Sequence, residues 1–227
     1  MLTSGVEIKV APSILAADFS RLGEQVAEAS NGGADYIHVD MMDGHFVPPI
    51  TIGAQVVSAI RPWSEVPIEV HMMVEEPTKF IPELVDAGAD TAVVHVEACK
   101  DLRSTVDKIV SSGIKAGVAL SPSTSELSLQ GVLSNISLVV AMTVEPGWGG
   151  QPFIPKVLDK VTRIRSMIDD GGYDAELEVD GGINIETAGY AVKAGAGILE
   201  AGTAIYASGV PVDHAIANIR QSVHNIN

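Results

Sequence analysis

Short runs of aliphatic and β-branched residues alternate with longer segments in which apolar residues recur every three or four positions. The short runs have the length and composition of buried strands, and the longer segments have the periodicity of amphipathic helices. In the segment 19–30, for example, Leu22, Val26 and Ala29 fall on one helical stripe. The eight predicted strands are Ile8–Ser13, Tyr36–Asp40, Ile68–His71, Thr91–Val96, Ala116–Leu120, Leu138–Met142, Glu176–Asp180 and Ile198–Ala201.

Glycine follows most of the predicted helices. A glycine just past a helix accepts a positive φ without strain, which makes it the preferred residue there. Because strands and helices alternate strictly, we expect parallel strands joined by right-handed crossovers. Eight strands within 227 residues favour a single (β/α)8 barrel domain over 1–227, rather than a doubly wound open sheet. The predicted helices 77–87, 101–112, 157–169 and 186–194 end at Gly88, Gly113, Gly171 and Gly195.

Composition and charge narrow the range of partners. The chain has 29 acidic against 14 basic residues and a net charge of −15, without a basic run. Nucleic acid is therefore not an expected partner, because binding it requires clustered Lys and Arg. Any attraction for an anionic substrate must come from local positive features.

The sequence also bears on the cellular compartment. Cys99 is the only cysteine, so no intrachain disulfide forms, which suits a reducing compartment. Residues Met1 to Glu7 are too short and polar for a signal or transit peptide, and no apolar run approaches the ~18 residues of a membrane span. We expect a cytoplasmic protein, although a plastid form with its leader removed also fits, and we expect no membrane partner.

Polar residues stand at the carboxyl ends of several predicted strands, where barrel active sites lie. His38 and Asp40 are two residues apart, so they share one face of a strand while Ile37 and Val39 share the other. A buried aspartate is costly unless it is paired, hydrogen-bonded or bound to a metal. Two histidines and two aspartates at one barrel mouth match the ligands of a divalent transition metal. The sequence thus favours a metal site at His38, Asp40, His71 and Asp180.

Other inward polar residues compete with this set. His95 and Glu97 share a face of the fourth strand, and Glu69 and Glu178 lie two residues before His71 and Asp180. Strand periodicity places those two glutamates one layer deeper in the barrel, either supporting the site or purely structural. Spacing alone does not choose among these candidates.

Three glycine-rich turns follow the sixth, seventh and eighth strands. Glycine lets backbone N–H groups approach an anion closely, and barrels often bind phosphate after the seventh and eighth strands. The turns contain no Lys or Arg, so backbone groups would carry the binding. They are PGWGGQ (146–151), DGG (180–182) and AGT (201–203).

Three methionines lie at or just past strand ends. Met42, Met73 and Met142 would either fill gaps in the core or form an apolar floor beneath a reacting carbon. The two interpretations are equally compatible with the sequence.

Seven motifs follow one another along nearly the whole chain. They are APSILAADF (11–19), IHVDMMDGHFVP (37–48), VHMMVEEP (70–77), HVEA (95–98), MTVEPGWGGQPFIP (142–155), EVDGGIN (178–184) and AGTAIY (201–206). In this order they resemble the motifs of the ribulose-phosphate 3-epimerase family, and chance agreement of so many ordered motifs is not a serious alternative.

The resemblance implies a metal-dependent epimerase that interconverts D-ribulose 5-phosphate and D-xylulose 5-phosphate in carbohydrate metabolism. It implies one divalent ion per chain, zinc or else Fe(II), Mn or Co, held by His38, Asp40, His71 and Asp180, and not by His95 or Glu97. Asp40 and Asp180 would also be the acid–base pair. Further copies of the chain are an expected partner beside the phosphorylated ketose. The implied substrate contacts are Ser13, His71, Gly147, Trp148, Gly149, Gly150, Asp180, Gly181, Gly182, Gly202 and Thr203.

Departures from the family pattern and rival chemistries limit this interpretation. Trp148 stands where Phe is usual, Thr203 where Ser is common, and Pro49 where Asn is frequent. The first two lie near the substrate, so allulose 6-phosphate 3-epimerase is the nearest alternative. A Schiff-base aldolase needs a lysine at the barrel mouth, and a related decarboxylase needs Asp-x-Lys-x-x-Asp, which DMMD (40–43) lacks. A non-catalytic sugar-phosphate binder is disfavoured, because both catalytic carboxylates are present.

Overall fold

Parallel strands form a ring at the centre of the molecule. The structure, a computed structural model, describes residues 8–223, so Met1 to Glu7 lie outside it. Eight strands follow the order β1-β8-β7-β6-β5-β4-β3-β2. A parallel bridge between Ser13 and His38 joins the two ends of this order and closes the barrel. The strands are β1 (Lys9–Pro12), β2 (Ile37–Met42), β3 (Ile68–Met73), β4 (Thr91–His95), β5 (Lys115–Leu120), β6 (Leu138–Met142), β7 (Glu176–Asp180) and β8 (Ile198–Ala201).

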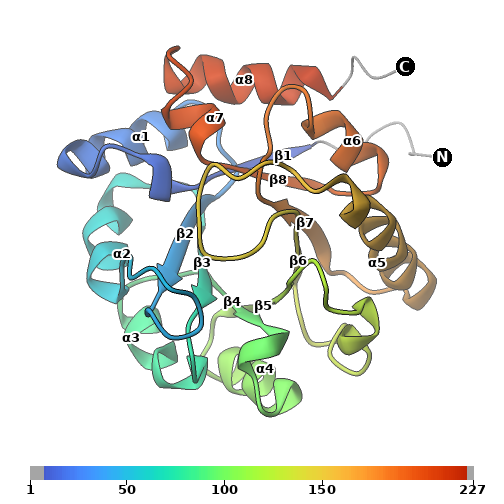
Figure 1. The fold of residues 1–227 in the computed structure, drawn as a ribbon. Helices are drawn as coiled ribbons and strands as arrows, with labels where there is room; N and C mark the ends of the chain where they lie inside the picture. The colour runs from blue at the N-terminus through green and yellow to red at the C-terminus, as the bar shows by residue number, and fades with distance from the viewer. Residues whose placement is uncertain (1–7, 224–227) are drawn as a thin grey trace.

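Helices surround the strands, as Figure 1 shows in a view along the barrel. Parallel neighbours require a crossover, and the buried residues of α1, α4, α5 and α8 pack on the outer face of the sheet. The predicted (β/α)8 barrel is confirmed. The α-helices are α1 (Leu22–Asn31), α2 (Ala54–Ile60), α3 (Ile81–Asp86), α4 (Leu102–Ser111), α5 (Leu158–Gly171), α6 (Ala188–Lys193), α7 (Thr203–Tyr206) and α8 (Val212–Ser222). Short 3₁₀ helices are η1 (Ile14–Ala16), η2 (Phe19–Arg21), η3 (Arg61–Trp63), η4 (Pro77–Lys79), η5 (Val96–Ala98), η6 (Glu126–Leu129) and η7 (Pro155–Val157).

The connection between β5 and β6 departs from the expected alternation of strands and helices. Its regular structure is the 3₁₀ helix η6, not an α-helix. The segment before η6 reads SPSTS (121–125), and Ser, Thr and Pro favour turns over helices because of their local hydrogen bonds and restricted backbone. Ser125 begins η6 by accepting a hydrogen bond from the Leu127 N–H. The expectation of strict alternation is therefore wrong at this connection.

Glycine ends most of the helices as predicted. Gly88, Gly113 and Gly195 have φ values of 85°, 91° and 112°. One prediction was wrong by a residue, because α5 includes Gly171 and ends at Gly172, whose φ is 61°. Of two adjacent glycines, either can take the left-handed conformation, so the sequence does not distinguish them.

Neighbouring residues of a strand face different regions of the core. Ile37 and Val39 belong to the large apolar layer between the strands and the helices. Val93, Val140 and Ile198 belong to a smaller cluster inside the barrel. The inward positions of β2 include the polar residues His38 and Asp40 beside Met42, so the barrel interior is not uniformly apolar.

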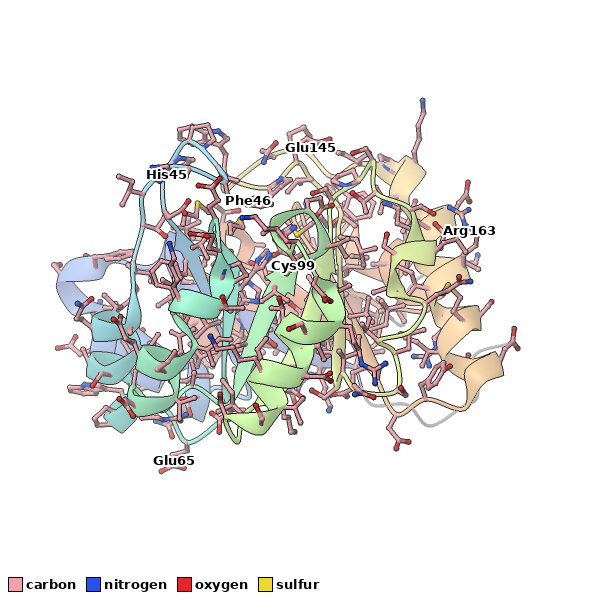
Figure 2. The ribbon with its side chains drawn as sticks, turned by 90° about the horizontal axis from the view of Figure 1, so that it is seen from below. His45, Phe46, Glu65, Cys99, Glu145 and Arg163 are labelled. Carbon is pink, nitrogen blue, oxygen red and sulfur yellow. The ribbon has the colours of Figure 1, made fainter. Side chains whose placement is uncertain are left out.

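The loops that follow the strands gather at one end of the barrel. Figure 2 shows His45 and Phe46, which follow β2, and Glu145, which follows β6, at this end. Glu65, which precedes β3, lies at the opposite end. The segment between β6 and α5 crosses the barrel opening in Figure 1. The strand ends that carry the predicted site residues therefore open toward these loops.

The α-helices are short. The longest, α5, has 14 residues. Within residues 8–223, no helix has the length and apolar character needed to cross a membrane.

Candidate active site and metal centre

The ends of β2, β3 and β7 bring two histidines and two aspartates together. Asp40 and His71 are direct partners in the β2–β3 register, which sets their side chains next to each other. The Asp40 Oδ1 atom lies 3.4 Å from both His38 Nε2 and His71 Nδ1. The Asp180 Oδ2 atom lies 3.0 Å from His71 Nδ1 and 3.6 Å from His38 Nε2. The four residues that the sequence singled out thus converge on one point.

The atoms at this point fit a divalent cation. His38 Nε2, His71 Nδ1 and Asp180 Oδ2 are buried, and none has a hydrogen-bond partner. Buried polar atoms are normally paired, so three unpaired atoms facing one another call for a common partner. Four ligand atoms about 2.1 Å from a tetrahedral zinc ion lie about 3.4 Å apart. The observed separations of 3.0 to 3.6 Å agree with that geometry.

Two buried glutamates lie beside the Nδ1 atom of His38, one layer deeper in the barrel. Glu69 Oε1 lies 2.7 Å and Glu178 Oε1 lies 3.3 Å from the His38 Nδ1 atom. A carboxylate on the second ring nitrogen fixes the tautomer of a metal-binding histidine and directs its other nitrogen at the metal. Burial, with Glu69 beside it, raises the pKa of Glu178 well above its usual range. Glu69 is therefore the carboxylate best placed to orient His38.

The charges within the cluster shift the protonation of its members. Burial lowers the pKa of His71, but the carboxylates of Asp180 and Asp40 raise it to about 9. Burial likewise lowers the pKa of His38, and Asp40 outweighs this and raises it well above the usual value. Burial raises the pKa of Asp40, yet the two histidines bring it well below its usual range. Without a cation, the imidazoles thus carry the compensating positive charge.

A cavity of about 410 Å³ opens above this cluster. Asp40 and Asp180 lie in its wall, whereas His71, although expected to contact substrate, is fully buried and does not line it. All three methionines of the suggested apolar floor lie in the wall as well. The other predicted site residues that line the cavity are Ser13, Met42, Met73, Met142, Gly147, Trp148, Gly149, Gly150, Gly181, Gly182, Gly202 and Thr203.

The glycine turns approach the cavity through tightly packed backbone. Gly182 has a φ of 69°, and a Cβ on it would lie 2.6 Å from the backbone nitrogen of Phe153. The Gln151 side chain donates to the carbonyl oxygens of Glu145 and Trp148, at 2.6 and 2.9 Å, and so holds the turn after β6 in shape. None of the residues that line the cavity is a lysine or arginine.

Glu200 also lines the cavity, which the sequence analysis missed. Its Oε2 atom accepts a hydrogen bond of 3.3 Å from the Gly181 N–H, so this N–H is already engaged. Burial and the nearby Asp180 raise the pKa of Glu200 well above its usual range. The available signal was a charged residue two positions after the inward Ile198 on the same strand.

The fold and the site together show the class of protein to which the chain belongs, the enzymes built on a (β/α)8 barrel. A (β/α)8 barrel with ionisable groups and a cavity at the carboxyl ends of its strands has the arrangement common to the active sites of this fold. The buried cluster adds a candidate metal centre to that arrangement.

Comparison with known proteins gives the family. A model of the Ribulose-phosphate 3 epimerase family matches residues 9–206, and the chain belongs to this family. The chain is 50% identical to ribulose-phosphate 3-epimerase of Bacillus subtilis (strain 168) over 200 residues, which cover 88% of this chain and 92% of that protein. It is 45% identical to the chloroplastic ribulose-5-phosphate-3-epimerase of Arabidopsis thaliana over 202 residues, or 88% and 72% of the two chains.

Solved structures with low sequence identity share the barrel. An orotidine 5'-phosphate decarboxylase from Pyrococcus horikoshii OT3 aligns with a TM-score of 0.68 at 17% identity, covering 96% of this chain and 100% of that one. A 3-hexulose-6-phosphate synthase aligns with a TM-score of 0.67 at 20% identity, covering 96% and 99%. At these identities the likeness concerns the fold alone.

Proposed function

We propose that this chain epimerises C3 of a ketose phosphate and interconverts D-ribulose 5-phosphate and D-xylulose 5-phosphate. The observation that carries the proposal is that Asp40 and Asp180 belong to one buried cluster and both lie in the wall of the cavity. Family membership and the names of the relatives support the same reaction. A cavity of about 410 Å³ is large enough for a five-carbon sugar phosphate.

His38, Asp40, His71 and Asp180 would hold one divalent cation. Two nitrogens and two carboxylate oxygens suit zinc, and Fe(II), Mn or Co also fit this donor set. When bound, the cation supplies Lewis-acid stabilisation of negative charge on the substrate oxygens. The three unpartnered buried atoms of the cluster support this assignment.

Asp40 and Asp180 would act as the two proton-transfer groups. The C3 hydrogen lies next to the C2 carbonyl, so its removal gives an enediolate, and inversion requires a proton on the opposite face. One carboxylate takes the first proton and the other, protonated, delivers the second. Ser13 donates a 2.6 Å hydrogen bond to Asp40 Oδ2 and so fixes the orientation of that carboxylate. Strong coupling within the cluster allows one carboxyl to be protonated while the other is ionised.

The rest of the cavity would bind and orient the sugar. Met42, Met73 and Met142 would form an apolar floor that excludes water from the planar enediolate. The turns at Gly149–Gly150, Gly182 and Gly202–Thr203 would hold the phosphate through backbone N–H groups. Gly181 contributes less than the sequence suggested, because its N–H already donates to Glu200.

The decisive experiment is an assay of both candidate substrates. We expect conversion of D-ribulose 5-phosphate to D-xylulose 5-phosphate, with kcat/KM at least about tenfold higher than for allulose 6-phosphate. The reverse preference would assign the chain to allulose 6-phosphate, and inactivity on both would favour a sugar-phosphate binder. A Schiff-base aldolase is disfavoured, because the cavity wall has no lysine.

Cellular location and assembly are further proposals. The relative from Arabidopsis thaliana is named as chloroplastic, so both a cytoplasmic and a plastid location fit this chain. We also propose that the chain forms a homo-oligomer, which light scattering of the purified protein would test.

Substitution of Gly202 is expected to weaken phosphate binding. A Cβ at this position would lie 3.3 Å from Ala16 Cβ, so either Ala16 or the turn must give by a few tenths of an ångström, and it would also project beside the backbone N–H groups of the turn. We expect Gly202→Ala to raise KM about tenfold, or about 1.4 kcal/mol of binding, with a smaller change in kcat. Steady-state kinetics with D-ribulose 5-phosphate measure both values.

Gly197→Ala is the matched control for this prediction. A Cβ at Gly197 would meet no atom closer than the Leu177 carbonyl oxygen at 3.9 Å, and Gly197 does not line the cavity, so KM should stay unchanged. Gly182 is a poorer test, because a Cβ there would collide with the Phe153 backbone and disturb the fold. Equal KM values for Gly202→Ala and the parent protein would contradict phosphate binding at this turn.

Acid is expected to weaken cation binding to the metal-free protein. The His71 pKa is about 9 in the absence of a cation, so this imidazole is protonated at pH 7. Its Nδ1 atom must lose a proton before it can bind, and His38 has a raised pKa as well, so affinity should fall at least about tenfold for each pH unit below that pKa. Calorimetry of zinc binding in buffers with different ionisation enthalpies should show proton release at pH 7. Binding without proton release would contradict the assignment of His71.

A further inference from the structure

We propose that His95 and Glu97 are positioning residues, which hold His71 in the tautomer and orientation needed at the cluster. They would do so through a hydrogen-bond chain that runs from β3 across the end of β4 to the turn after β5. This inference rests on the proposed metal site and deepens it. Neither residue touches the substrate cavity, so each acts only through His71.

The hydrogen-bond chain begins at the ring of His71. Its Nδ1 atom faces the carboxylates of Asp180 and Asp40 and has no hydrogen-bond partner. Its Nε2 atom lies 2.8 Å from His95 Nε2. The other nitrogen of His95, Nδ1, lies 3.1 Å from Glu97 Oε2. Both imidazoles are fully buried, so water does not compete for these atoms.

The carboxylate at the far end fixes the direction of every proton. Glu97 only accepts when ionised, so His95 must carry its proton on Nδ1 and leave Nε2 as an acceptor. His71 must then donate from Nε2, and its Nδ1 keeps a free lone pair facing Asp40 and Asp180. If every donor and acceptor were exchanged, the proton of His71 would lie on Nδ1 and point into the cluster, where a cation needs a lone pair.

Glu97 is held in its ionised form and in its place. Its Oε1 atom accepts a 2.9 Å hydrogen bond from the Ser121 N–H and another from the Thr124 hydroxyl. Burial raises the pKa of Glu97, but His95, Thr124 and Ser121 lower it to about 2. The carboxylate, fixed by these hydrogen bonds, therefore stays an acceptor at neutral pH.

The turn after β5 is itself anchored. The largely buried ammonium group of Lys160 in α5 donates to the carbonyl oxygens of Ser121 and Pro122, at 2.8 and 2.6 Å. Phe46 packs on the ring of His95, with a distance of 4.9 Å between the two ring centroids. The turn after β5, held by α5, and the loop after β2 thus enclose His95, an imidazole that the proposed chemistry does not use directly.

The test replaces Glu97 with an amide of the same shape. In Glu97→Gln, the Ser121 N–H and the Thr124 hydroxyl both favour the amide oxygen on their side, which turns the NH2 group toward His95. His95 would then accept at Nδ1 and donate from Nε2, and His71 would be driven into the wrong tautomer. We expect the zinc dissociation constant to rise at least about tenfold, as measured by competition with a chromophoric chelator.

Two variants and one spectrum complete the experiment. Thr124→Val removes one of the hydrogen bonds to Glu97 and should raise the dissociation constant by about threefold. Glu126→Gln removes a carboxylate that pairs with Arg163 and takes no part in the hydrogen-bond chain, so it should leave the dissociation constant unchanged. The ¹⁵N spectrum of the histidine rings in the zinc-loaded parent should show His95 protonated on Nδ1 and His71 on Nε2.

The outcomes separate this inference from the proposed metal site. A parent protein that binds no divalent cation overturns both. A parent that binds zinc, with Glu97→Gln binding it equally well, overturns the positioning role alone. His95 protonated on Nε2 in the zinc-loaded parent also overturns it, even if Glu97→Gln fails to fold.

Discussion

Metal-free protein is expected to lose about three orders of magnitude in kcat and to recover it when a divalent cation is restored. Without a Lewis acid, removal of the C3 proton loses several kcal/mol of charge stabilisation. Each 1.4 kcal/mol lowers the rate tenfold. The metal-free cluster would also hold protonated imidazoles, since the carboxylates raise the pKa of His71 to about 9. Elemental analysis before and after chelation, with add-back of Zn, Fe(II), Mn and Co, measures the effect and the preferred ion.

A pair of histidine variants controls this experiment. His71→Asn should lose both the cation and the activity, because it removes one of the four atoms that converge at the cluster. His45→Asn should keep both, because His45 is exposed on the loop after β2. Full activity in protein shown to be free of metal would contradict the proposed role of the cluster.

The barrel could be predicted because its signals are local. A strand buried on both faces is a short apolar run, and a helix against it has a stripe of period 3.6, so both appear in the printed sequence. The prediction failed where local chemistry changes the pattern, as in the serine-rich connection before η6. It also failed at Gly171, since two neighbouring glycines are equally able to end a helix.

The cluster could be predicted in part for the same reason. His38 and Asp40 share a strand face by simple alternation, which is a local property. The pairing of Asp40 with His71 depends on the register of two strands, and the 2.8 Å contact between His71 and His95 depends on side-chain orientation. Spacing carries neither kind of information, so spacing alone left the roles of His95, Glu97 and Glu69 open, and only the family resemblance excluded His95 and Glu97 as ligands. Glu200 was not predicted, because one charged residue in a strand of four does not show whether its side chain faces inward or outward.

Replacing one carboxylate is expected to stop epimerisation while sparing proton exchange on one face of C3. If Asp40 and Asp180 each serve one face, Asp180→Asn can still remove the proton that Asp40 reaches but cannot reprotonate the other side. The full reaction should fall about 10²- to 10⁴-fold. In deuterated water, Asp180→Asn should exchange the C3 hydrogen of only one of the two epimers, and Asp40→Asn that of the other. Proton NMR of recovered D-ribulose 5-phosphate and D-xylulose 5-phosphate measures this.

Metal content decides how such variants are interpreted, because both aspartates belong to the cluster. Ser13→Ala is a useful companion, since it removes the 2.6 Å hydrogen bond to Asp40 Oδ2 and leaves the four converging atoms unchanged. It should slow exchange on the face that Asp40 serves more than on the other. Epimerisation retained by metal-loaded Asp180→Asn would require another acid, and Glu200, in the same cavity wall, would be the next residue to replace. Equal exchange of both epimers by either variant would mean that a single mobile base serves both faces, which contradicts the two-carboxylate assignment.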